Sequence, residues 1–184
     1  MSNRKKSFNA ENYIEEEKLK EDAKKISVKE AASYSLMDGF GLRFITPYAL
    51  ALNASRLQIG LLSSLPALFA NFSQIFTPKL MEKYSRKRIV FTGIFIQSIM
   101  WLILIGIGFL YFFFDYNTSF FLVLAYTLLI LVGTATGPAW SSWMKDLTHG
   151  TNVGEFFAKR GKIAVMIALF CMLIAGFILD YFKN

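Results

Sequence analysis

The sequence predicts an all-α integral membrane protein with about five transmembrane helices. Of its 184 residues, 54% are hydrophobic and 16% are aromatic. Four long segments contain no Asp, Glu, Lys, Arg or His, namely residues 57–78, 89–114, 119–144 and 163–179. A segment of about 17–25 mostly apolar residues can cross the hydrocarbon core of a bilayer as a helix. Because the chain has several such segments, a soluble globular domain is excluded.

The first 30 residues differ from the rest in being densely charged. Residues 1–30 hold eight Lys or Arg and seven Asp or Glu. The pairs Glu16/Lys20 and Glu21/Lys25 are spaced i,i+4, which stabilises a solvated helix. We therefore expect this region to be a charged cytoplasmic tail or membrane-surface helix. A solvated tail that serves only topology is the simpler alternative.

The remaining chain, residues 31–184, is expected to form a transmembrane helical bundle. Charged and turn-forming residues separate its apolar segments, and they set the expected ends of each span. The five expected spans lie at roughly residues 32–52, 59–80, 89–113, 119–143 and 162–182.

The basic residues gather on one side of these expected spans. Seventeen of the twenty Lys and Arg residues fall in the N-terminal region, in residues 79–88 and in residues 145–162. Loops rich in Lys and Arg remain in the cytoplasm. We therefore expect a multi-pass protein of the cell membrane with its N-terminus in the cytoplasm and its C-terminus outside. This topology accounts for the net charge of +7, so no nucleic-acid partner is expected.

Two ionisable residues, Asp38 and Arg43, lie inside the first expected span. A charge left in lipid costs several kcal/mol, so both should face the bundle interior or water. Five residues correspond to about 140° on an ideal helix, which argues against a direct pair unless Gly39 and Gly41 distort the helix. The two residues are candidates for a substrate or ion pathway, and pairing with another helix is the structural alternative.

The second expected span carries small and polar residues at three- and four-residue steps. These are Gly60, Ser64, Ala67, Asn71, Gln74 and Pro78. Such a face either packs against another helix or lines a cavity, and helix packing is the favoured interpretation. Asn71 and Gln74 are the members best suited to line a polar path, and Gln97 in the third span is a weaker candidate.

Similar steps of small residues occur in later spans, and three spans contain an internal proline. The small residues are Gly133 and Gly137 in the fourth span, and Ala164, Ala168, Cys171 and Ala175 in the fifth. Pro47, Pro66 and Pro138 each remove a backbone hydrogen bond. The carbonyl freed at membrane depth then needs a hydroxyl group, a neighbouring helix or water.

The loop between the second and third spans reads Pro78-Lys79-Leu80-Met81-Glu82-Lys83-Tyr84-Ser85-Arg86-Lys87-Arg88. It resembles the signature Gly-x-Leu-Ala-Asp-Arg-x-Gly-Arg-Lys of the major facilitator superfamily at the same loop. Leu80, Glu82, Lys83, Arg86 and Lys87 stand in register with that signature. The resemblance continues in Gly137-Pro138-Ala139-Trp140 and in residues 155–161, and covers roughly residues 30–184.

The resemblance implies twelve helices in two six-helix halves, with a solute held between the halves and access alternating by rocking. It further implies that Glu82, Lys83, Arg86 and Lys87 form a gating loop at the cytoplasmic rim. Glu82 would accept hydrogen bonds from a neighbouring helix end, and the three cations would anchor the rim. Five spans would then be an incomplete N-terminal six-helix bundle.

We therefore expect the N-terminal part of a secondary active transporter that moves an unknown small solute by alternating access. The chain is expected not to be competent alone, because its frame is truncated or a separately encoded C-terminal remainder completes it. The alternative is a non-transporting membrane assembly partner or a degenerate remnant.

A membrane enzyme is the third class of function, and the sequence disfavours it. Asp38-Gly39-x-x-x-Arg43 matches only part of the lipid-headgroup transferase signature, and the further carboxylates needed to hold two divalent cations are missing. The sequence also offers no Ser/His/Asp set and no metal-ligand cluster, so we expect no cofactor.

Overall fold

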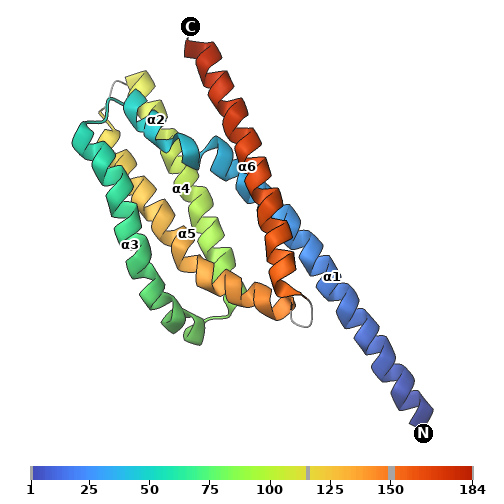
Figure 1. The fold of residues 1–184 in the computed structure, drawn as a ribbon. Coiled ribbons are helices and arrows are strands. Elements are labelled where there is room, and N and C mark those ends of the chain that lie inside the picture. The colour runs from blue at the N-terminus through green and yellow to red at the C-terminus, as the bar shows by residue number, and fades with distance from the viewer. Residues whose placement is uncertain (1, 115–116, 149–151, 184) are drawn as a thin grey trace. The chain divides into compact units, whose positions relative to one another are not determined.

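The computed structural model describes residues 2–114, 117–148 and 152–183, and these described residues form helices and no strands. The expectation of an all-α fold is therefore confirmed. In chain order (Figure 1), the elements are α1 (Ser2–Phe40), the short 3-10 turn η1 (Leu42–Phe44), α2 (Ile45–Ala51), α3 (Arg56–Lys83), α4 (Arg86–Phe114), α5 (Ser119–Leu147) and α6 (Val153–Lys183).

Four helices within the described residues are long and apolar enough to cross a membrane. They are Arg56–Lys83, Arg86–Phe114, Ser119–Asp146 and Val153–Phe182. These helices overlap the second to fifth expected spans. They extend beyond the expected spans at most of their ends, because each helix continues into the charged residues that flank its apolar segment. The chain is therefore a multi-pass membrane protein whose environment is the lipid bilayer.

The first expected span, residues 32–52, is not one helix. The chain leaves α1 after Phe40, passes through η1 and resumes a helix only at Ile45. Glycine destabilises a helix interior, and Gly41 lies at the break. Pro47 cannot donate to the Arg43 carbonyl, but it falls in the first turn of α2, where backbone N–H groups have no helical partner in any case. Proline therefore marks a helix start here and not a kink.

The described chain divides into two compact units, which we describe separately. One unit contains the chain up to Arg43 and the chain from Lys145 onwards, and the other contains residues 44–144.

The first unit is held together by close packing of α1 on α6. Small residues of α1 are buried at every fourth position, at Ser27, Ala31, Ser35 and Gly39. A Cβ atom placed on Gly39 would lie 2.5 Å from the Ala168 carbonyl oxygen. Cys171 and Ala175 of the predicted small-residue face of α6 are buried. That face therefore packs as the sequence predicts, against a stripe on α1 that was not predicted.

The second unit packs α5 against both α3 and α4. Gly93 of α4 lies directly against the Thr136 side chain, and Ile89, Val90 and Ala139 form a buried apolar cluster. Thr77 of α3 donates a hydrogen bond to the Ala135 carbonyl oxygen at 3.0 Å. The acceptor is the carbonyl next to that of Thr134, which Pro138 leaves without a helical donor.

Side-chain hydrogen bonds connect the turns at one end of the second unit. Ser55 and Gln58 form a reciprocal capping box at the start of α3. The Gln58 side-chain oxygen also accepts from the Ser119 hydroxyl at 3.1 Å, and the Asn53 amide donates to the Tyr111 hydroxyl. The turn before α3 is thereby tied to the start of α5 and to the end of α4.

Candidate functional site

Asp38 and Arg43 form a direct ion pair at the break between α1 and α2. Arg43 Nη2 lies 3.0 Å from Asp38 Oδ2, and Arg43 Nε lies 3.3 Å from the same oxygen. The ideal-helix estimate, which argued against a direct pair, is therefore wrong. Helical spacing ceases to apply after Phe40, and the turn through Gly41 and η1 carries Arg43 back toward Asp38.

The two partners of this pair differ in exposure. The Asp38 side chain is 21% exposed and the Arg43 side chain is 59% exposed. Because Nε and Nη2 share one carboxylate oxygen, Arg43 keeps further N–H donors that this pair does not use. The pair neutralises a charge that would be costly within a bilayer, and it also leaves an accessible cationic surface at the helix break.

Asn71 and Gln74 lie on an exposed face of α3. Every member of the predicted small and polar stripe is exposed, from Gly60 to Pro78. The face that packs inside this unit is a different one, with Leu62, Pro66, Ala70 and Thr77 buried. The stripe is therefore not a packing face between the described helices, although it shares its three- and four-residue periodicity with the face that is.

The exposed stripe places amide and hydroxyl groups on a helix that is apolar enough to cross the membrane. The Asn71 amide donates to the Ala67 carbonyl at 2.9 Å, and the Ser64 hydroxyl donates to the Gly60 carbonyl at 3.0 Å. The Asn71 side-chain oxygen is left to accept from another group. Polar surface of this kind is poorly matched to acyl chains.

Gln97 occupies a different environment from Asn71 and Gln74. Its amide nitrogen donates to the Leu129 carbonyl of α5 at 3.4 Å, and it lies directly against Gly133. Gly133 thus provides the space that the Gln97 amide fills. The structure places Gln97 in the α4–α5 contact.

The gating loop predicted from residues 79–88 is a tight turn between α3 and α4. Lys83 ends α3, and its ammonium group lies 5.6 Å from the centre of the Tyr84 ring. The Ser85 hydroxyl accepts from the Arg88 N–H, as a helix N-cap does. Glu82 and Lys87 are exposed, and Arg86 is half-buried.

The positive charges of this loop are favourable at the end of α3 and unfavourable at the start of α4. Lys83 is favourable at the C-terminus of α3, where the helix dipole is negative. Arg86, Lys87 and Arg88 occupy the first turn of α4, which has no acidic residue. Cations at a positive helix end are repelled by the dipole, so an anionic surface or partner is favourable beside the exposed Lys87 and Arg88.

A polar cluster that was not predicted from the sequence joins α1 to α6. Arg160 Nε donates to both the carbonyl and the hydroxyl oxygen of Ser27 at 3.2 Å, and Arg160 Nη2 pairs with Glu30. Only 16% of the Arg160 side chain is exposed. The four-residue spacing of Ser27, Ala31, Ser35 and Gly39 was the available signal, but it lay partly in the region interpreted as a tail.

The arrangement offers no evident metal centre. Within residues 2–114, 117–148 and 152–183, no three His, Cys, Asp or Glu side chains are grouped so that they could hold a metal ion. The chemistry present is that of binding and charge compensation, carried by the Asp38–Arg43 pair and by the amides of α3.

Comparison with known proteins identifies the family. A family model described as Major Facilitator Superfamily matches residues 31–183. No match was found among curated proteins or among solved structures. The matched region begins within α1 and includes the ion pair, the exposed stripe and the α3–α4 loop, and it confirms the resemblance drawn from the sequence. The chain belongs to the major facilitator superfamily and is a transporter protein of that type.

Proposed function

We propose that the chain is the N-terminal part of a secondary active transporter, which moves a small solute across the cell membrane by alternating access. The Asp38–Arg43 pair carries this proposal. It lies at a helix break, within the region that matches the family, and discontinuous helices are typical of solute sites in secondary transporters.

In this proposal Arg43 contacts the solute and Asp38 positions Arg43. Arg43 is the more exposed partner and retains unused donors, whereas Asp38 is the more enclosed partner. The exposed amides of Asn71 and Gln74 are proposed to belong to the solute pathway as well, since lipid does not satisfy them. Gln97 would have a smaller part, because its amide is engaged with α5.

The chain is proposed to act with a C-terminal remainder and not alone. The exposed polar stripe of α3 supports this, because a polar face on a membrane helix requires a partner or an aqueous cavity. The exposed Glu82 and Lys87 would meet that partner at the cytoplasmic rim. The N-terminus would lie in the cytoplasm and the C-terminus outside, as the distribution of basic residues indicates.

Uptake in cells tests the proposal. The chain would be expressed in frame with the coding sequence that follows it, and accumulation of a panel of radiolabelled amino acids, sugars and organic acids would be measured. We expect uptake of one class, and its loss in Asp38→Asn and Arg43→Gln at unchanged protein level. Glu155→Gln and Lys159→Gln, at exposed sites on α6, are matched controls that should retain uptake.

The outcome that contradicts the proposal is equally definite. Unchanged uptake in both Asp38→Asn and Arg43→Gln would remove the pair from the solute path. Arg43→Lys separates the two roles of the arginine, because lysine keeps the charge but loses the planar donor group. We expect Arg43→Lys to raise KM more than it lowers the maximal rate.

A further inference from the structure

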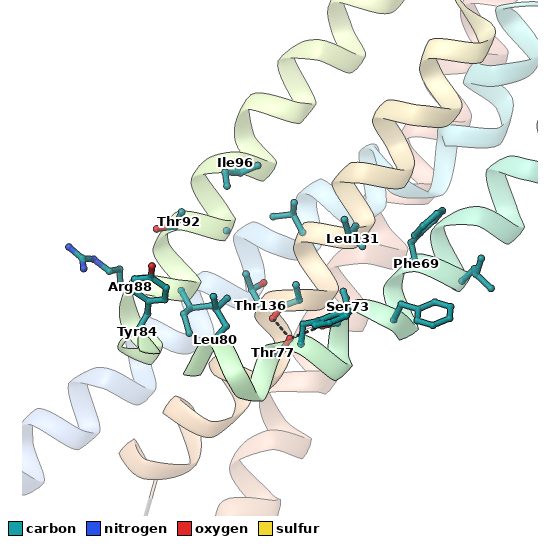
Figure 2. Close-up of a pocket in the computed structure, with 17 residues that line it drawn as sticks. Phe69, Ser73, Thr77, Leu80, Tyr84, Arg88, Thr92, Ile96, Leu131 and Thr136 are labelled. Atoms are coloured by element: carbon teal, nitrogen blue, oxygen red, sulfur yellow. Dashed lines mark hydrogen bonds between the residues drawn. The ribbon is translucent and has the colours of Figure 1, made fainter. Parts of the chain in front are cut away.

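A deep apolar groove runs between α3 and α4, with α5 as its floor (Figure 2). Its volume is about 890 Å³. Phe69, Phe72 and Leu80 line it from α3, Ile96 lines it from α4, and Leu131 and Val132 lie on the floor. A cavity of this size is at the upper end of the range for small-molecule sites. It is a site on a membrane-spanning unit that the transport proposal does not use.

Three of the hydroxyl groups that line the groove, those of Ser73, Thr77 and Thr136, already have partners within the protein. The Ser73 hydroxyl donates to the Ala70 carbonyl at 2.7 Å, and the Thr136 hydroxyl donates to the Gly133 carbonyl at 2.8 Å. Thr77 donates to Ala135, as described above. These groups place no demand on a ligand, so the body of the groove suits a hydrocarbon and not a polar solute.

The mouth of the groove has the opposite character. Arg88 and Tyr84 lie at the end where α3 turns into α4, and Arg88 extends from the first turn of α4 (Figure 2). Arg88 is exposed, and the positive end of the α4 dipole adds to its charge. An arginine beside a helix N-terminus is well suited to bind a phosphate group.

The dimensions fit one leaflet of a bilayer. The groove follows α3 from Leu68 to Leu80, which at the helical rise is about 18 Å. Half of the hydrocarbon core is about 15 Å thick. An acyl chain laid along the groove would therefore reach from the membrane centre to the interface, where Arg88 meets the headgroup.

We propose that this groove binds an anionic phospholipid, with its phosphate on Arg88 and one acyl chain along α3. The phosphate would also offset the repulsion between the α4 dipole and the exposed cations Lys87 and Arg88, since the first turn of α4 has no acidic residue. Basic sites between membrane helices are known to hold anionic headgroups. An apolar protein helix would fill the groove without supplying this negative charge. The proposal does not depend on the transport function.

Native mass spectrometry of the purified full chain in detergent tests the site. Dioleoyl-phosphatidylglycerol and dioleoyl-phosphatidylcholine would be titrated in parallel, with inorganic phosphate as a competitor. We expect one phosphatidylglycerol to bind roughly fivefold more tightly than phosphatidylcholine. We expect Arg88→Gln to remove this preference while weak binding of either lipid persists, and excess phosphate to leave the bound lipid in place.

Matched variants separate the groove from the general surface. Ile96→Trp fills the groove and should lower binding of both lipids, whereas Ile94→Trp, which is exposed outside the groove, should not. Lys79→Gln removes a nearby charge that does not line the groove and should retain the preference. Equal binding by Arg88→Gln and the unaltered chain overturns the proposal. So would phosphate displacing the lipid, or a dimer that Ile96→Trp dissociates.

Discussion

Gly39 of α1 lies directly against Cys171 of α6, so that a Cβ atom on Gly39 would come within 2.6 Å of the Cys171 Cβ. Only a residue without a side chain permits this approach. The contact continues the stripe of small residues that begins at Ser27, and it fixes how closely α1 can approach α6 in the first unit.

Gly39→Leu is therefore expected to destabilise the protein. The new side chain would collide with Cys171 and with the Ala168 carbonyl, and overpacking of this kind costs about 1–3 kcal/mol. The melting temperature of the purified chain in detergent should fall. Gly176→Leu, on α6, is the matched control and should melt like the unaltered chain, because no described atom outside the local helix backbone lies within 4 Å of the point where its side chain would begin. Equal melting of the two variants would contradict the packing described.

The Asp38–Arg43 pair should show a coupling in stability. Asp38→Asn or Arg43→Gln alone leaves one charge without its partner, whereas the double variant removes both charges. We expect the double variant to be more stable than the sum of the single effects predicts, by about 0.5–3 kcal/mol, in thermal unfolding. Additive effects would mean that the contact has no energetic weight. Uptake should remain absent in the double variant, which separates a role in transport from a role in stability.

Arg160 is expected to hold the charged part of α1 against α6. Arg160→Gln removes the pair with Glu30 and the contacts with Ser27, and hydrogen bonds to charged groups contribute about 1.5–3 kcal/mol. Trypsin cleavage at Lys24 and Lys25 should then become faster. Glu30→Gln should have a smaller effect, because the contacts with Ser27 remain.

The control for this measurement is Lys159→Gln, an exposed cation next to Arg160 in the sequence. Cleavage at the unaltered rate in Arg160→Gln would show that the cluster does not restrain α1.

Gln58→Ala should destabilise the end of the second unit where side-chain hydrogen bonds connect the turns. The substitution removes the side-chain half of the capping box and the hydrogen bond with Ser119. A typical hydrogen bond contributes about 0.5–1.5 kcal/mol, so the melting temperature should fall. Gln74→Ala, at an exposed position of the same helix, should leave it unchanged. A fall of the same size in both would contradict a specific role for Gln58.

Topology can be tested with reporters at both chain ends. Because the first segment is broken and four described helices qualify as spans, the crossing of the α1–α2 segment decides whether the ends lie on opposite faces. We expect an N-terminal fluorescent protein to be in the cytoplasm and a C-terminal alkaline phosphatase to be active outside. A reporter inserted at Ser85 should be cytoplasmic. Both termini on one face would contradict the expected five crossings.

The sequence was sufficient to predict the features that depend on composition. Long charge-free segments indicate membrane helices wherever they occur, and α3 to α6 were recognisable for that reason. The family was recognisable from the acid and bases between α3 and α4, and the family comparison confirms it.

Features that depend on which face meets which partner were harder to predict. The stripe that contains Asn71 and the buried face that contains Ala70 have the same periodicity, and only the neighbouring helices decide between them. The Asp38–Arg43 contact depends on where α1 ends, and glycine weakens a helix without fixing its last residue. The packing of Ser27 cannot be predicted from the sequence alone, because a stripe of small residues is informative only once its partner helix, here α6, is known.

The continuity of α1 has a mechanical consequence. It is helical without interruption from Ser2 to Phe40, so no loop separates its charged beginning from Asp38. Lys18 and Asp38 are twenty residues apart, so at about 1.5 Å per residue the helix between them is roughly 30 Å long. Movement of the charged end along the helix axis is therefore expected to move the carboxylate that pairs with Arg43 as well.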